Sequence, residues 1–124
     1  MTVLVVDDSE AVASIIARIA THGGWNALYA VNTDEALVLL QEQKVDLLML
    51  DYIMPHQNGL EFAQYLRANG WPSLPIILFS GDANRINRDE AEKAGITHIF
   101  QKPLSISELR ATMNETRYHI PKRG

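Results

Sequence analysis

The chain has 124 residues, 47% of them hydrophobic, and this length suits one compact domain with its own core. Its 11 basic and 15 acidic residues give a net charge of −4, so it lacks the broad basic face of a protein that binds nucleic acid directly. Cysteine is absent, which excludes disulfides and thiolate metal sites, and no apolar run approaches the roughly 18 residues of a membrane span.

Short apolar runs alternate along the chain with segments of helical periodicity. The first run, Thr2–Val6, predicts a strand, and Ala11, Ile15 and Ile19 recur after it at the spacing of a helix. Gly23 and Gly24 then signal a turn, as Asn69-Gly70 and Gly95 do further on. The other predicted strands cover residues 27–30, 46–50, 75–79 and 98–101, and helix-periodic residues at 36–40 and 60–66 lie between them.

A strand followed by a helix, five times over, predicts a parallel β-sheet covered on both faces. This reading explains why several of the strands are continuously apolar rather than alternating. In an open parallel sheet, ligands bind outside the carboxyl ends of the strands. The residues at these ends therefore carry the functional information: Asp7 and Asp8 after the first strand, Asp51 after the third, Ser80 and Gly81 after the fourth, and Lys102 and Pro103 after the fifth.

These strand ends combine three carboxylates, a hydroxyl and an ammonium group. Three close carboxylates repel one another unless a cation lies among them, and an oxygen-only set without His or Cys suits Mg²⁺. An aspartate beside such a metal can accept a phosphoryl group as an acyl phosphate, and Asp51 is the natural acceptor. Lys102 would supply a compact positive charge, Ser80 a hydroxyl donor, and Gly81 the space that a side chain would fill.

Each residue also has a simpler interpretation. Asp7 and Asp8 could merely cap a helix, Asp51 could be a loop acid, and Lys102 a solvated lysine. Ser80 could bond only to a nearby backbone group. Their joint placement at one sheet edge favours a site. We interpret Trp25, at a predicted turn, as a local packing residue.

Over nearly its whole length the chain resembles the receiver domain of two-component response regulators. The segments that carry the resemblance are VLVVDDSE, LLMLDYIMPHQNGLEF, PIILFSGDA and FQKPLSISEL. The resemblance implies a three-layer flavodoxin-like (βα)5 fold with a five-stranded parallel sheet in the order 2-1-3-4-5. It also implies a chemotaxis-regulator-like receiver over residues 1–118 and a polar tail over 119–124.

The resemblance further assigns roles to single residues. Asp8 and Asp51 look like direct Mg²⁺ ligands, Ile53 like the donor of a backbone carbonyl ligand, and Asp7 like a ligand through water. Ser80 and Lys102 look like phosphoryl contacts. The Lys102–Pro103 peptide bond is expected to be cis.

The implied function is that of a cytoplasmic phosphoacceptor. A histidine kinase or histidine phosphotransfer protein would phosphorylate Asp51, and the resulting switch would be read by a downstream protein or output domain. Such a domain assists its own phosphorylation and dephosphorylation but is not otherwise an enzyme. A stand-alone regulator and the N-terminal part of a longer protein both fit the sequence.

Two rival functions share part of this pattern. An aspartate-nucleophile phosphatase needs a second carboxylate two residues after its nucleophile, and Ile53 stands there, so this interpretation fails. A receiver fold that binds partners independently of phosphate stays open as the alternative.

The sequence also departs from the family pattern on the fifth strand. Receivers commonly carry an aromatic residue three positions before the lysine, where this chain has Ile99. By strand alternation Phe100 should face the other side of the sheet. We therefore expect the loop after Ser80, over residues 82–86, to report phosphorylation.

Overall fold

Five parallel strands form a single sheet in the computed structural model, which describes residues 1–119. The sheet order is β2-β1-β3-β4-β5, as the sequence analysis expected. The predicted strands are confirmed, with bounds shifted by one or two residues at several ends. The strands are β1 (Thr2–Val6), β2 (Asn26–Ala30), β3 (Leu47–Asp51), β4 (Ile76–Ser80) and β5 (Ile96–Gln101).

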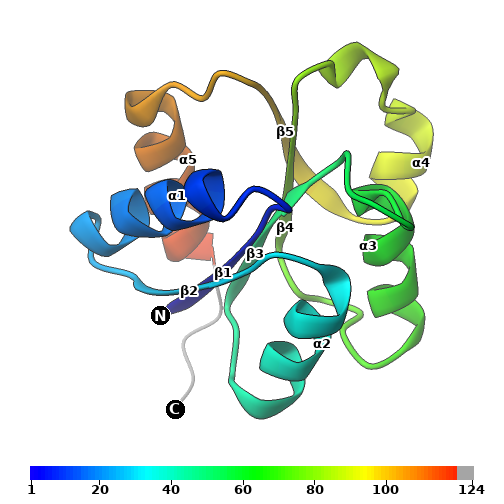
Figure 1. The fold of residues 1–124 in the computed structure, drawn as a ribbon, viewed down its shortest axis with the longest axis horizontal. Coiled ribbons are helices and arrows are strands. Elements are labelled where there is room, and N and C mark those ends of the chain that lie inside the picture. Colours follow the sequence, from blue (N-terminus) through cyan, green and yellow to red (C-terminus); the bar gives the residue numbers. More distant parts are fainter. Residues whose placement is uncertain (120–124) are drawn as a thin grey trace.

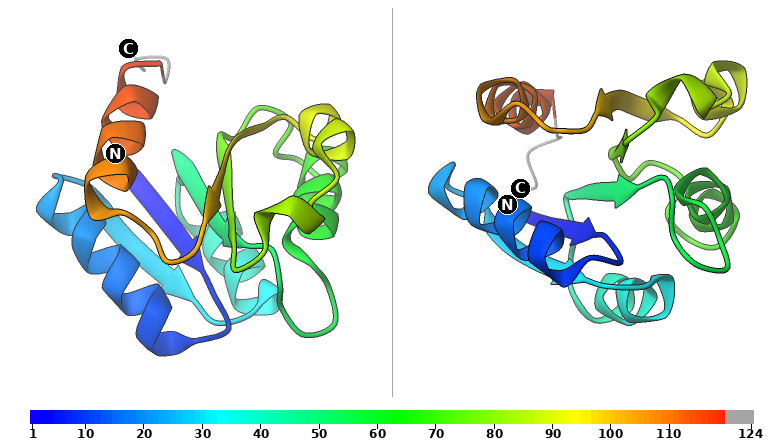
Figure 2. Two further views of the ribbon diagram at one scale, coloured as in Figure 1. Left: turned by 90° about the horizontal axis from the view of Figure 1, so that it is seen from above. Right: turned by 45° about the horizontal axis from the view of Figure 1, so that its top comes forward.

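Five α-helices cover the two faces of the sheet (Figures 1 and 2). α1 and α5 lie side by side on one face, and α2, α3 and α4 lie on the other. A short 3-10 helix, η1, precedes α4. The helices are α1 (Glu10–His22), α2 (Thr33–Glu42), α3 (Gly59–Ala68), η1 (Ala83–Arg85), α4 (Arg88–Lys93) and α5 (Ile106–His119). The structure is therefore the three-layer α/β fold that was predicted.

Two apolar clusters, one on each face of the sheet, make up the core. Successive residues of one strand enter different clusters: Leu48 and Leu50 pack toward α2, α3 and α4, whereas Leu47 and Met49 pack toward α1 and α5. All four side chains are fully buried. The strand is apolar along its whole length because helices cover both of its faces.

Helix caps fix the loops that lead out of the strands. The Ser9 hydroxyl accepts a hydrogen bond from the N–H of Val12 and starts α1 directly after Asp7 and Asp8. At α3, Asn58 and Glu61 form a reciprocal capping box. Both caps stand at the carboxyl edge of the sheet, so they order the loops around the strand ends.

Within the described part of the chain, every helix is too short or too polar to cross a bilayer. The tail expected over residues 119–124 lies outside the described residues, except that His119 is the last residue of α5.

Candidate functional site

The predicted site residues meet at the carboxyl edge of the sheet. Asp7 directly follows β1, Asp51 ends β3, Ser80 ends β4 and Lys102 directly follows β5. β1, β3, β4 and β5 are consecutive neighbours in the sheet. Because the strands are parallel, residues from positions 7 to 102 of the chain reach the same edge.

Three carboxylates form the centre of this edge. Asp7, Asp8 and Asp51 each offer a carboxylate oxygen, and these oxygens all lie within 4.8 Å of one another. Asp7 and Asp51 are buried, with 1% and 4% of their surfaces exposed, whereas Asp8 is exposed. The cluster therefore consists of two buried acids, Asp7 and Asp51, and one solvent-exposed acid, Asp8.

Lys102 bridges the two buried acids. Its Nζ donates to Asp7 Oδ2 at 3.0 Å and to Asp51 Oδ2 at 3.3 Å. The same ammonium group lies 5.1 Å from the centre of the Phe79 ring, a cation–π arrangement. One positive charge is thus shared between two negative ones, and the cluster keeps a net negative charge that attracts a cation.

Backbone groups hold the acids unequally. The second oxygen of Asp7, Oδ1, accepts from the N–H of Ser9 at 2.9 Å. Asp51 Oδ1 accepts a longer bond, 3.4 Å, from the N–H of Ile53. Among the described residues Asp8 has no hydrogen-bond partner. Asp7 is therefore the most firmly held acid, and Asp51 and Asp8 keep more free coordination capacity.

Burial and the neighbouring charges change the protonation of this cluster. Burial, followed by repulsion from Asp7, raises the pKa of Asp51 to about 6, although Lys102 acts in the opposite direction. Burial by itself would lower the pKa of Lys102, but its hydrogen bond to Asp7 and the attraction of both acids outweigh burial and raise that pKa. Lys102 therefore stays charged at neutral pH.

Ser80 is fully buried at the end of β4 and is not bonded to the acids. Its Oγ accepts from the N–H of Asp82 at 3.0 Å, a local backbone bond of the kind that the simpler interpretation of Ser80 predicts. A Cβ atom built at Gly81 would meet no atom within 4 Å. Open space therefore adjoins Ser80, and no protein contact requires glycine at position 81.

Sequence reasoning missed Gly59. A Cβ atom at this position would come within 2.5 Å of the Asp51 carbonyl oxygen, because the start of α3 packs directly on the backbone of residues 51 and 52. The N–H of Gly59 donates to the Tyr52 carbonyl at 2.7 Å. Glycine is needed here for a close approach that a turn pattern alone does not reveal.

Gln101 was missed as well. Its Oε1 accepts from the N–H of Ala83 at 2.9 Å, and its Nε2 donates to the carbonyls of Gly81 and Lys102. Long polar side chains at the end of an edge strand are usually solvated, so nothing in the sequence marked this one.

β5 presents its side chains to the two faces of the sheet in turn. Ile99 packs against the core cluster beneath α3 and α4, and Phe100 against the cluster beneath α1 and α5, as alternation predicted. The Lys102–Pro103 peptide bond is cis, which confirms that prediction. The Ile53 side chain is half exposed and outside both clusters.

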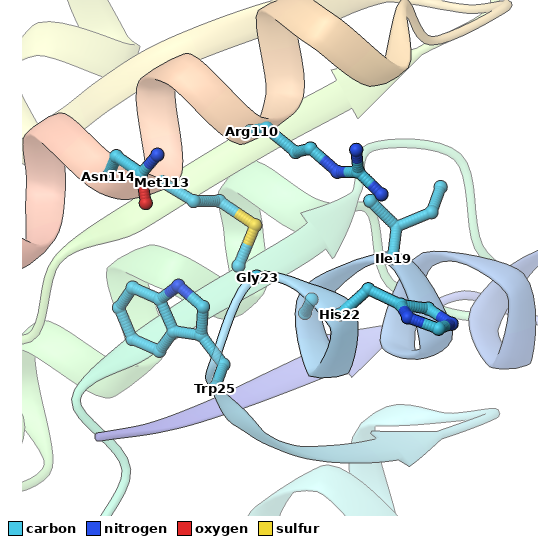
Figure 3. Close-up of a pocket in the computed structure, with 8 residues that line it drawn as sticks. Ile19, His22, Gly23, Trp25, Arg110, Met113 and Asn114 are labelled. Atoms are coloured by element: carbon cyan, nitrogen blue, oxygen red, sulfur yellow. The ribbon is translucent and has the colours of Figure 1, made fainter.

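A cavity of about 360 Å³ lies between α1 and α5 (Figure 3). Trp25 in its lining directly precedes β2, so the cavity is at the amino ends of the strands, whereas the acids are at the carboxyl ends. Trp25, only 3% exposed, packs in its wall with Met113, which confirms its predicted packing role. The indole nitrogen is buried and has no hydrogen-bond partner among the described residues. The guanidinium of Arg117 stacks 4.9 Å from the ring. This cavity is separate from the acidic cluster.

Comparison with known proteins gives one consistent result. The model of the response regulator receiver domain matches residues 3–114. The phosphate regulon transcriptional regulatory protein PhoB of Pseudomonas aeruginosa is 30% identical over 113 residues, which are 90% of this chain and 49% of that protein. The response regulator MprA of Mycobacterium avium is 34% identical over 113 residues, 91% of this chain and 49% of that protein. The chain thus spans about half the length of these relatives.

A solved structure agrees with this result. The receiver domain of the Francisella response regulator 1452 superimposes with a TM-score of 0.84 at 28% identity, covering 97% of this chain and 98% of that one.

Proposed function

The chain belongs to the family of response regulator receiver domains, and we propose that Asp51 accepts a phosphoryl group from a histidine kinase or a histidine phosphotransfer protein. The observation that carries this proposal is the cluster of Asp7, Asp8 and Asp51 with the Lys102 ammonium bridging two of them. Three carboxylates and one ammonium group leave the cluster with a net negative charge. A divalent cation would offset this charge, so that a phosphoryl group, itself negative, could approach.

The donor set fits Mg²⁺. It consists of oxygen atoms only, and the exposed Asp8 leaves the cluster open on its solvent side. Asp8, Asp51 and the Ile53 carbonyl would hold the metal directly, and Asp7 would hold it through water. When bound, Mg²⁺ neutralises negative charge and orients phosphoryl oxygens.

The residues of the chain divide the chemistry between them. A carboxylate oxygen of Asp51 bonds to phosphorus as the donor's bond to phosphorus breaks, so an acyl phosphate forms and the donor group leaves with its electron pair. Lys102 places a compact positive charge beside the transferred group. The Ser80 hydroxyl donates to a phosphoryl oxygen, and the open space at Gly81 accommodates the group.

The modified domain then acts as a switch. A phosphoryl group shifts a conformational equilibrium only through contacts that differ between the two states. The Ser80 hydroxyl, which accepts from the N–H of Asp82 and is not bonded to Asp51 in this structure, would make such a contact with the phosphoryl group. The switched surface would regulate a downstream protein or an output domain in the cytoplasm. The alternative, a phosphate-independent interaction module, makes no use of the acidic cluster.

A phosphodonor experiment tests the proposal. Acetyl phosphate with Mg²⁺ should add one base-labile phosphoryl group, visible by intact mass, to the wild type and not to Asp51→Asn. Omitting Mg²⁺ should abolish the addition. Labelling that persists in Asp51→Asn would refute the assignment, and absence of labelling in the wild type would favour the phosphate-independent module.

A further inference from the structure

The side chain of Gln101 ties the loop after β4 to the end of β5. Its carboxamide accepts from the N–H of Ala83 and donates to the carbonyl of Gly81, so it bonds on both sides of Asp82. The N–H of Asp82 itself bonds to the Ser80 hydroxyl. Three backbone groups of this short loop are therefore held by two side chains, one from each strand.

The anchor of this link is fixed. Gln101 is the register partner of Ser80 in the β4–β5 pair, and the N–H of the next residue, Lys102, donates to the Ser80 carbonyl at 2.8 Å. The backbone at the end of β5 thus stays in the sheet whatever the loop does. Movement of residues 81–83 away from β5 must stretch or break the bonds of Gln101.

Such movement accompanies the function proposed above. The Ser80 hydroxyl now bonds to the N–H of Asp82, and a turn toward a phosphoryl group on Asp51 draws residues 81 and 82 with it. Gly81 itself has no side chain, and even a Cβ built there would meet no atom within 4 Å. Gln101 opposes the movement, because its hydrogen bonds to Ala83 and Gly81 hold the loop in its unphosphorylated position.

Ile99, the neighbouring residue on this side of β5, cannot form a polar contact with the loop. It lies two residues before Gln101 on the same side of β5 and is packed against the core cluster beneath α3 and α4. Its aliphatic side chain has no polar group to contact the loop. Gln101 therefore supplies the polar contact between β5 and the loop.

We propose that Gln101 is a positioning residue, a latch that stabilises the unphosphorylated position of residues 81–83 and is released when Ser80 engages the phosphoryl group. This proposal rests on the function proposed above. By linkage, removal of the latch should favour the phosphorylated conformation.

The first test measures the affinity for beryllofluoride, a phosphoryl analogue, in the presence of Mg²⁺. Gln101→Ala loses both loop bonds, to Ala83 and Gly81, which lie at or near the surface. It should bind beryllofluoride about two- to tenfold more tightly than the wild type, because two such bonds together contribute roughly as much as one ordinary hydrogen bond. A merely structural role would predict equal or weaker binding.

Thr97→Val is the matched control. Thr97 is also on β5, and its hydroxyl donates to the backbone of β4 at the carbonyl of Ile76, 3.0 Å away, at the opposite end of the strand pair. Removing that bond should leave beryllofluoride affinity unchanged. An equal gain in Thr97→Val would show that any loosening of β5 has the same effect, and would overturn the latch.

The second test needs no phosphoryl analogue. Hydrogen exchange of the Ala83 amide should be about two- to tenfold faster in Gln101→Ala than in the wild type, and unchanged in Thr97→Val. Unchanged exchange in Gln101→Ala would refute the latch whatever the domain binds. Failure of the wild type to bind beryllofluoride would instead refute the proposed function, and the switching role of Gln101 with it. Binding by the wild type with the same affinity in Gln101→Ala would refute the latch alone.

Discussion

The ammonium group of Lys102 lies 3.0 Å from a carboxylate oxygen of Asp7, although 95 positions separate the two residues in the chain. This contact is shorter than the one from Lys102 to Asp51. In the unphosphorylated protein the lysine is thus held mainly by Asp7, whose two carboxylate oxygens each have one hydrogen-bond partner. Asp51, the proposed acceptor, is the weaker partner.

Removing the lysine charge should destabilise the metal-free protein. Lys102→Met leaves Asp7 and Asp51 close together without their shared cation, so the free energy of unfolding at pH 7 should fall by about 1–3 kcal/mol. The pKa of Asp51 should also rise above its present value of about 6, because Lys102 lowers it. Urea denaturation and carboxyl ¹³C shifts measure the two effects. Lys93→Met, at the exposed end of α4, is the control and should change neither.

Neutralising Asp51 should have the opposite effect on stability. Its pKa in the folded protein, about 6, is above the ordinary value of 3.8, so the folded state binds the proton more tightly than the unfolded state. The free energy of unfolding therefore falls as the pH rises from 3.8 to about 6, and the loss is complete above that pH. Asp51→Asn should be more stable than the wild type by about 1–3 kcal/mol at pH 7 without metal.

The pH dependence supplies the check on this prediction. The difference between Asp51→Asn and the wild type should vanish near pH 3.5, where the carboxyl group is largely protonated in both states. A constant advantage at every pH would mean that the substitution acts through packing and not through charge. Urea titrations in EDTA at several pH values distinguish the two cases.

Asp8 should matter for metal binding and little for folding. It is exposed and has no hydrogen-bond partner among the described residues, yet it completes the acidic cluster. Asp8→Asn should weaken Mg²⁺ binding by about tenfold or more in calorimetry. Its stability without metal should stay within about 0.5 kcal/mol of the wild type. The exposed Asp89 on α4 provides a control, and Asp89→Asn should leave Mg²⁺ affinity unchanged.

Two glycines beside the site should respond differently to alanine. A Cβ at position 59 collides with the Asp51 carbonyl, so Gly59→Ala should lower the free energy of unfolding by about 1–3 kcal/mol and shift the Asp51 amide resonance. A Cβ at position 81 meets nothing, so Gly81→Ala should fold with wild-type stability. If the proposed phosphoryl site is correct, Gly81→Ala should nonetheless weaken beryllofluoride binding.

Two outcomes would contradict these expectations for Gly59→Ala and Gly81→Ala. Wild-type stability in Gly59→Ala would show that α3 retreats easily from β3. Unchanged beryllofluoride affinity in Gly81→Ala would show that the phosphoryl group does not use the space beside Ser80. Thermal unfolding and NMR titration of both variants give these results directly.

Sequence alone was sufficient to place Asp7, Asp51, Ser80 and Lys102 on one edge of a sheet. The reason is geometric, since in a parallel α/β sheet every strand ends at the same edge, and an apolar run followed by a polar residue marks that end. The sheet order and the cis bond before Pro103 were expected from the resemblance to receivers, and both are confirmed.

Only the tertiary structure decided which of these residues touch. The Lys102 contact with Asp7, the approach of Gly59 to Asp51 and the two bonds of Gln101 each depend on strand register and helix placement to within a fraction of an ångström. Residue patterns with periods of 2 and 3.6 define which face a side chain occupies, but not how far it lies from a partner on another element. That distance is set by the packing of the whole core, where contributions from many side chains combine.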